Sequence, residues 1–149
     1  MPATEYHATF GLGHSDSNSL HSERTDMSNN PVGWFEIYVQ DMVRAKAFYE
    51  AVFGVALTKL DSKDIEMWAF PMQQEHAGAS GALVKMPGVS SGGNSVLVYF
   101  SCTDCAVEAA KVTKAGGRIQ KEKFSIGQYG HISLISDTEG NMIGLHSMS

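Results

Sequence analysis

An internal duplication is the feature of this 149-residue chain that most constrains its fold. The strand-like stretch FEIYV (35–39) runs into Asp41, a residue type that favours a helix N-cap, and apolar residues then recur at helical spacing up to Gly54. The stretch LVYFSC (97–102) runs in the same way into Asp104, before a second helical segment that closes at a pair of glycines. Both the caps and the closing glycines are 63 residues apart, so the sequence predicts two copies of one strand–helix unit.

The same offset continues beyond the two helices. MWAFPM (67–72) aligns with GHISLI (130–135), and Gly81 aligns with Gly144. Each unit reads as strand, helix and then two or three strands, and a unit of about 60 residues is too short to bury much core alone. We therefore expect two such units that pair their sheets, with the helices covering the outside. The expected modules span about residues 32–88 and 94–148.

Composition limits the class of protein and its partners. With 43% hydrophobic and 18% charged residues, the chain fits a soluble globular domain. Its formal charge of −5 comes without a basic patch, so nucleic acid is not an expected partner. No apolar run approaches the ~20 residues that span a bilayer, so no membrane association is expected. The sequence shows no export signal, and we expect a cytoplasmic protein.

The first 30 residues differ from the rest of the chain. They are polar, rich in Ser, Asn, Asp and Glu, and poor in large apolar side chains. This composition is typical of a disordered leader. Met27 offers an alternative start, and residues 31–149 are expected to form the folded domain.

The two cysteines stand in CTDC, at Cys102 and Cys105. One interpretation is a redox C-x-x-C at a strand-to-helix junction. The other is that the two thiols simply pack on either side of the Asp104 cap. We favour packing, because a low thiolate pKa requires suitable neighbours as well as a helix N-terminus.

Strand alternation divides the side chains of the expected sheet between two faces. Phe35, Ile37 and Val39 suit the helix side. A polar and aromatic opposite face is what a cup around a small ligand needs, although packing under loops or a subunit is the alternative. We predict that the ligand-binding residues on that face are Trp34, Glu36, Tyr38, Leu97, Tyr99, Ser101, His131, Ser133, Gly144 and His146.

Two runs carry a resemblance to a known family. One is the strand–Asp–x–x–x–Ala–x–x–Phe–Tyr run from Val39 to Tyr49, and the other is DTEGN (137–141) before the final strand. With them the chain resembles, over roughly residues 31–148, the vicinal-oxygen-chelate superfamily of glyoxalase I, bleomycin-resistance proteins and extradiol dioxygenases. The resemblance implies an α+β fold of two paired βαβββ modules that form a cupped mixed sheet with helices outside. In metalloenzyme members the cup holds a divalent metal at its centre.

The resemblance also assigns the metal-ligand positions, which carry His or Glu in those members. The first-strand positions are Trp34 and Leu97, and the last-strand positions are Gly144 and, by the offset, Gly81. None of these four side chains can donate to a divalent cation. We therefore expect no metal at the usual site and no other cofactor.

Three functions remain open at this point. The first is a metal-free protein that binds a small, aromatic or amphipathic molecule, as the bleomycin-resistance proteins do by sequestration. The second is an enzyme, such as a glyoxalase-like lyase, in which Glu36, His131 and His146 form a shifted metal site or perform acid–base chemistry. The third is an interaction domain with an unused cup. We favour the first and, from the module pairing usual in the superfamily, expect a homodimer.

Overall fold

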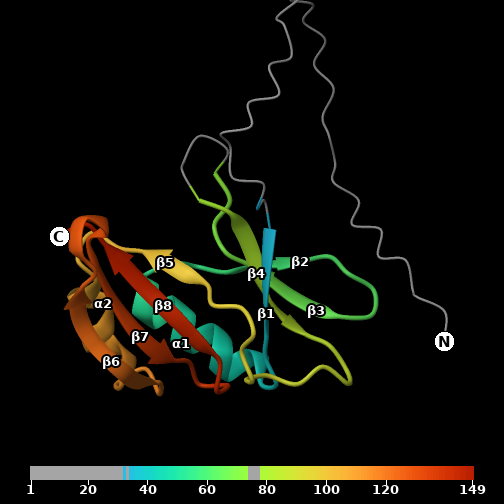
Figure 1. Cartoon of the computed structure of the whole chain (residues 1–149). Helices are drawn as coiled ribbons and strands as arrows, with labels where there is room; N and C mark the ends of the chain where they lie inside the picture. The colour runs from blue at the N-terminus through green and yellow to red at the C-terminus, as the bar shows by residue number, and fades with distance from the viewer. Residues whose placement is uncertain (1–31, 33, 74–77) are drawn as a thin grey trace, which may run out of the picture. The chain divides into compact units, whose positions relative to one another are not determined.

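Two βαβββ modules follow one another in the computed structural model, which describes residue 32, residues 34–73 and residues 78–149 (Figure 1). The expected disordered leader and the alternative start at Met27 lie outside the described residues. The elements of module 1 are β1 (Trp34–Tyr38), α1 (Met42–Phe53), β2 (Thr58–Leu60), β3 (Glu66–Ala69) and β4 (Ser80–Lys85). Module 2 consists of β5 (Tyr99–Ser101), α2 (Cys105–Val112), β6 (Arg118–Ser125), the 3-10 turn η1 (Gly127–Tyr129), β7 (His131–Ser136) and β8 (Met142–Ser147).

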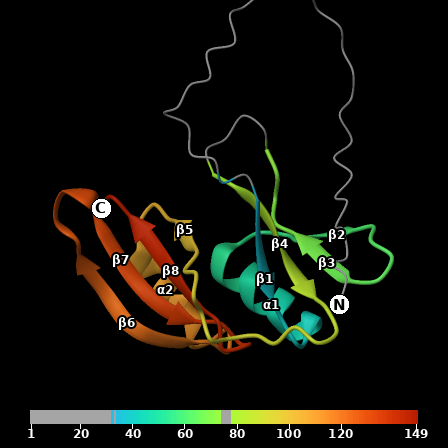
Figure 2. The ribbon, with the colours of Figure 1, turned by 45° about the vertical axis from the view of Figure 1, so that its right-hand side comes forward.

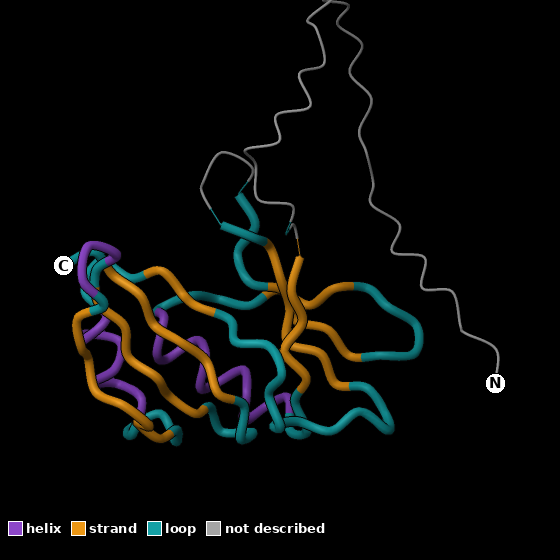
Figure 3. The backbone as a smooth tube through the Cα atoms, in the orientation of Figure 1, coloured by secondary structure: helices purple, strands orange, loops and turns teal. Residues whose placement is uncertain are grey.

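The two sheets have the same topology. Module 1 has the strand order β1-β4-β3-β2, and module 2 has the order β5-β8-β7-β6. Figure 3 shows the strands of the two sheets in orange and the helices in purple. In each module the first and last strands pair in parallel, and the other pairs are antiparallel. The predicted duplication and the α+β fold class are therefore confirmed. No helix in the described part of the chain is long and apolar enough to cross a membrane.

Both helices begin where their aspartate caps predict. The Asp41 carboxylate accepts a hydrogen bond from the backbone N–H of Arg44 at 3.0 Å, and Asp104 caps α2 in the same way. Gly54 ends α1 in the left-handed conformation that glycine adopts without steric cost (φ 63°). The second helix ends at Val112, a turn before the glycine pair that was expected to close it.

The hydrophobic core is continuous between the two modules. Phe100 of β5 stacks on Phe53 of α1 with ring centroids 4.4 Å apart, and it meets Phe35 of β1 edge-on at 6.1 Å. Tyr49 and Phe70 of module 1 also contact the Phe100 ring. Burying one such side chain is worth about 1.5–3 kcal/mol, so this shared cluster supplies the core that a single module lacks. Figure 2 shows α1 beside the strands of both sheets.

The turn between β7 and β8 joins module 2 to the start of α1. The Glu139 carboxylate accepts hydrogen bonds from the backbone N–H groups of Gln40 (3.0 Å) and Asp41 (2.8 Å) and from Arg44 Nε (2.7 Å). Burial alone would raise the pKa of Glu139, but these hydrogen bonds lower it to about 2. The carboxylate thus stays charged and caps the helix of the other module.

Asp137 and Asn141 complete this joint. The buried Tyr49 hydroxyl donates to Asp137 Oδ2 at 2.8 Å, and Asn141 Nδ2 donates to the Tyr38 carbonyl at 2.9 Å. Burial and the neighbouring Asp137 carboxylate raise the pKa of Tyr49 well above its ordinary value. The DTEGN run that carried the resemblance therefore holds the modules together in this structure.

The 63-residue offset is wrong by one residue at the last strand. Glu36 pairs with Ala82, whereas Tyr99, its counterpart 63 residues later, pairs with Gly144. Gly144 thus corresponds to Ala82 rather than to Gly81. A Cβ at Gly81 would meet the ring of Phe35, so Gly81 faces the helix side. The low residue identity between the two units left this one-residue difference invisible in the sequence.

Candidate functional site

The candidate site lies on the faces of the two sheets that point away from the helices, which are the faces expected to form the cup. We call them the outer faces. Ile37 and Phe100 pack in or against the core, so their strand neighbours project to the opposite side. This places Trp34, Glu36 and Tyr38 on the outer face of module 1, and Tyr99 and Ser101 on that of module 2, as predicted. The contact between Phe35 and Phe100 brings the two first strands, β1 and β5, near each other.

On the outer face of module 1, two aromatic side chains hold one carboxylate. Trp34 Nε1 donates to Glu36 Oε1 at 3.3 Å, and the Tyr38 hydroxyl donates to Glu36 Oε2 at 2.7 Å. Glu36 is exposed, while Trp34 and Tyr38 are half-buried. The carboxylate is thereby held between an indole and a phenol at the protein surface.

On the outer face of module 2, the ring of Tyr99 lies over Gly144. A Cβ at Gly144 would sit 2.2 Å from two ring carbons of Tyr99, which is closer than any real contact. The room at Gly144 is therefore taken by Tyr99 of the adjacent strand, and no contact with Trp34 is needed to explain it. A ring in this position shields the backbone of a strand glycine, and Tyr99 itself remains 46% exposed.

His146 shares the outer face with Gly144, as predicted from alternation along β8. The two residues pair with Ile132 and Leu134 of β7, whose side chains lie on the same face. His146 Nε2 lies 2.7 Å from the carbonyl oxygen of Tyr129, which fixes the orientation of the imidazole. The other ring nitrogen is the one that can serve a ligand from this position.

His131 and Ser133 are not on the outer face, and their predicted place beside His146 is wrong. Ser133 pairs with the core residue Leu145, and His131 pairs with Ser147. The Ser147 hydroxyl accepts the backbone N–H of Cys105 at the start of α2, which identifies this as the helix side.

The reason is the relative size of the side chains in β7. Ile132 and Leu134 are larger and more apolar than His131 and Ser133, and sequence reasoning gave them the helix side. Instead, the fully buried Ser133 lies on the side that α2 contacts and donates to the Lys121 carbonyl at 2.8 Å. The outer face of module 2 is itself apolar and half-buried, so polarity does not distinguish the two sides.

The residues present do not fit a divalent metal. His131 and His146 project from opposite faces of one sheet, so the shifted set of these two with Glu36 cannot converge on one ion. Ala82, which replaces Gly81 as the counterpart of Gly144, offers no donor either. Among the described residues no group of three or more His, Cys, Asp and Glu side chains is placed to hold a metal ion.

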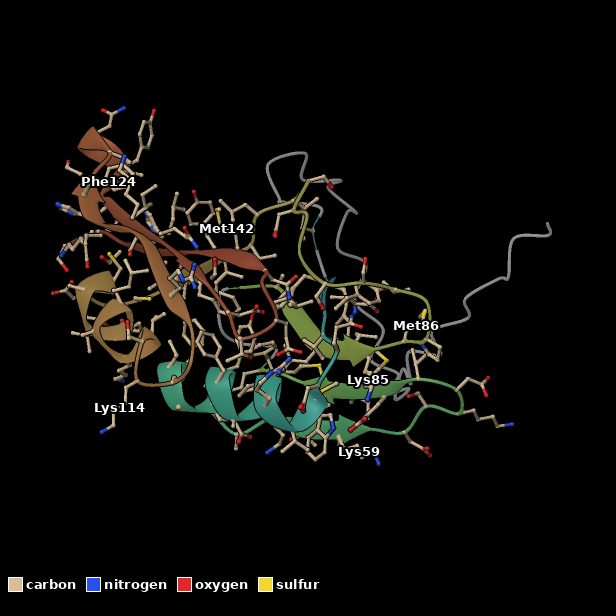
Figure 4. The ribbon with its side chains drawn as sticks, turned by 90° about the horizontal axis from the view of Figure 1, so that it is seen from below. Lys59, Lys85, Met86, Lys114, Phe124 and Met142 are labelled. Atoms are coloured by element: carbon tan, nitrogen blue, oxygen red, sulfur yellow. The ribbon has the colours of Figure 1, made fainter. Side chains whose placement is uncertain are left out.

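A pocket of about 370 Å³ opens at one end of the outer face of module 2. Leu97, one of the predicted ligand-binding residues, lines it together with Met142, which Figure 4 labels on β8. Sequence reasoning missed Met142, although it stands two residues before Gly144 and shares its face by alternation. The complete lining consists of Gly93, Asn94, Ser95, Val96, Leu97, Ser136, Gly140 and Met142.

The two cysteines behave as packed thiols. Both are free; Cys105 is fully buried and Cys102 is half-buried. Burial and the nearby Glu108 carboxylate raise the pKa of Cys102 to about 12, which keeps it protonated and unreactive near neutral pH. This arrangement supports the packing interpretation over the redox one.

Comparisons with known proteins point to one family. The family model described as "Glyoxalase/Bleomycin resistance protein/Dioxygenase superfamily" matches residues 32–145. A protein named "Putative glyoxylase CFP32", from Mycobacterium bovis and Mycobacterium tuberculosis, is 31% identical over 108 residues. That match covers 72% of this chain and 40% of the relative, so the chain spans less than half of the curated proteins it matches.

Solved structures share the fold. A mutant of glyoxalase I from Zea mays superposes with a TM-score of 0.64 at 23% identity, over 79% of this chain and 46% of that one. TnmS3, an antibiotic binding protein from Streptomyces sp. CB03234, gives a TM-score of 0.60 at 24% identity, over 83% of this chain and 99% of that one. At these identities the likeness shows the fold alone.

Proposed function

We propose that this chain, which belongs to the glyoxalase/bleomycin resistance protein/dioxygenase superfamily, binds a small, largely apolar or aromatic molecule on the outer faces of its sheets without a bound metal. The observation that carries the proposal is the pocket lined by Leu97 and Met142. It lies on the same strand face as the exposed Tyr99 ring over Gly144.

The chemistry of the outer face of module 2 supports such a ligand. Ile132, Leu134 and Met142 are half-buried there and offer apolar area, whose removal from water is worth about 25 cal/mol per Å². Ser101 and His146 lie on the same face and can orient polar groups of the ligand. An apolar surface with a few placed polar groups is typical of small-molecule sites.

The enzymatic alternatives have less support. A proton shuttle that uses both His131 and His146 would need them on one face, and they lie on opposite faces. The family's metal chemistry lacks its ligands at the matching positions. TnmS3, a structure with the same fold, is described as an antibiotic binding protein, and binding without a reaction is the activity we carry to this chain as a proposal.

The proposal is tested by titrating the full chain with N-phenyl-1-naphthylamine, a neutral aromatic probe whose fluorescence rises in an apolar site. We expect saturable binding near one probe per chain. Met142→Glu places a charge in the pocket, and the cost of bringing that charge out of water should weaken probe binding at least tenfold. The melting temperature of the variant shows whether it remains folded.

Met72→Glu is the matched control, because it makes the same change at a residue that is 53% exposed and lies outside the pocket. It should leave probe binding unchanged. Absence of saturable binding to the wild-type chain, or equal binding by the folded Met142→Glu variant, would overturn the proposal.

A further inference from the structure

The cluster of Trp34, Glu36 and Tyr38 joins a negative charge to two aromatic rings. All three side chains leave the same face of β1 at alternate positions, and both ring donors point to the Glu36 carboxylate. The cross-strand neighbour of Glu36 is the small Ala82. Among the described residues no lysine or arginine forms an ion pair with Glu36.

Three other carboxylates of the described residues are compensated by a cation of the protein. Glu139 is paired with Arg44, Asp104 with Lys123, and Glu50 with Lys46, each at 2.7–2.8 Å. Glu36 instead accepts hydrogen bonds from two neutral donors, which fix its orientation but do not neutralise its negative charge.

Module 1 contains a second tryptophan–glutamate pair, and an ammonium group lies against its tryptophan. Trp68 Nε1 donates to Glu66 Oε1 at 3.1 Å, with the same spacing of two residues along a strand. The ammonium group of Lys46 lies over the Trp68 ring, 4.9 Å from its centroid. The cation here comes from helix α1, where Lys46 also pairs with Glu50 at 2.8 Å, and cation–π attraction to Trp68 adds to that ion pair.

We propose that the Trp34–Glu36–Tyr38 cluster binds the positively charged end of the ligand, an organic ammonium group. The inference rests on the proposed function, since it takes the outer faces as the place where a ligand binds. Glu36 supplies the opposite charge, and the Trp34 ring supplies an electron-rich face for the methyl or methylene groups around the nitrogen. Tyr38 contributes through its hydrogen bond to the Glu36 carboxylate, which fixes the orientation of that carboxylate. A neutral group gains only apolar contact with the rings, and an anionic group is repelled by the Glu36 carboxylate.

The experiment compares choline with 3,3-dimethylbutan-1-ol, its uncharged isostere. Each is titrated into the ¹⁵N-labelled full chain while the indole N–H signal of Trp34 is followed by NMR, with Trp68→Phe used to assign the two indoles. We expect a saturable shift of the Trp34 signal with choline. The uncharged alcohol should bind at least threefold more weakly, because it lacks the cation–π and charge terms.

Glu36→Gln keeps the shape of the side chain and one of its two accepted hydrogen bonds but removes the charge. It should weaken choline binding about three- to tenfold, in the range expected for an exposed charge pair. Glu66→Gln is the matched control: it changes the other tryptophan-bonded glutamate and should leave choline binding at Trp34 unchanged.

The outcomes separate this inference from the proposed function. Equal binding of choline and the alcohol, or unchanged choline binding in Glu36→Gln, would overturn the ammonium site. The proposed function would still stand if N-phenyl-1-naphthylamine binds and Met142→Glu abolishes that binding. If the wild-type chain binds neither choline nor N-phenyl-1-naphthylamine, the ammonium site and the proposed function are both overturned.

Discussion

Gly144 and Tyr99 show how a single position can be misread when only its own strand is considered. A glycine within an apolar strand often marks the close approach of another group, and the sequence analysis placed Gly144 among the ligand-binding residues. The structure places the ring of Tyr99 over it, from the parallel strand β5. Gly144 therefore makes room for a side chain that is itself part of the candidate site.

Gly144→Ala is expected to lower the free energy of unfolding by about 1–2 kcal/mol, since the Tyr99 ring must leave its position. In a Tyr99→Ala background the same substitution should cost less, because the alanine then fills space rather than meeting a ring. The coupling energy from urea unfolding of the four proteins should lie at about 0.5–3 kcal/mol. Additive effects of the two substitutions would show that the ring does not rest on Gly144.

At the scale of elements, helix α1 depends on a residue from the other module. Its own cap, Asp41, satisfies one backbone N–H, and Glu139 of the β7–β8 turn accepts two more at Gln40 and Asp41. Unpaired N–H groups at a helix start attract negative charge, which the Glu139 carboxylate supplies. The backbone N–H groups at the start of α1 therefore receive all these hydrogen-bond partners only when the two modules are together.

The Glu139 joint gives a pH dependence with a defined sign. Its pKa falls from the ordinary 4.5 to about 2 in the folded protein, so its contribution is complete above pH 4.5 and is lost as the pH falls towards 2. Glu139→Gln should lower the free energy of unfolding by about 1–3 kcal/mol at pH 7. The difference from wild type should shrink between pH 4.5 and 3 in urea unfolding.

Glu122→Gln is the control, because Glu122 is an exposed glutamate of β6. It should change neither the stability nor its pH dependence by more than about 0.5 kcal/mol. A difference between Glu139→Gln and wild type that stays constant from pH 7 to pH 3 would contradict the assignment of the charge to this joint.

At the scale of the whole molecule, two modules share one aromatic core and leave two outer faces. Phe100 inserts among the rings of module 1, and the DTEGN turn (137–141) fastens α1. A homodimer and a cytoplasmic location stay predictions; sedimentation of the purified chain at micromolar concentration tests the first.

We predict that the purified full chain binds no stoichiometric divalent metal. Trp34, Leu97, Ala82 and Gly144 lack donor atoms for a metal, and His131 lies on the other side of the sheet from His146. Elemental analysis after purification with added Zn²⁺, Ni²⁺, Mn²⁺ or Fe²⁺ should find well under one equivalent per chain. About one tightly held ion per chain would show that another set of residues forms a metal site.

The sequence by itself determined the two strand–helix units and their order, but left open whether two or three strands follow each helix. Local signals are read from neighbours along the chain, so the Asp41 and Asp104 caps, the Gly54 stop and the alternation in β1 could all be found from spacing. The repeat then implied two paired modules, because one unit is too short to bury a core. Trp34, Glu36, Tyr38 and Gly144 were assigned to their correct faces for the same local reason.

Only the tertiary structure decided how the strands lie against one another and what covers them. A shift of one residue reverses the face of every side chain in a strand, and nothing local distinguished Gly81 from Ala82. The side of His131 was decided by tertiary packing, because α2 contacts β7 on the side where the small Ser133 is fully buried. The ring of Tyr99 over Gly144 and the Glu139 cap are also long-range contacts, which form only once the two modules have assembled.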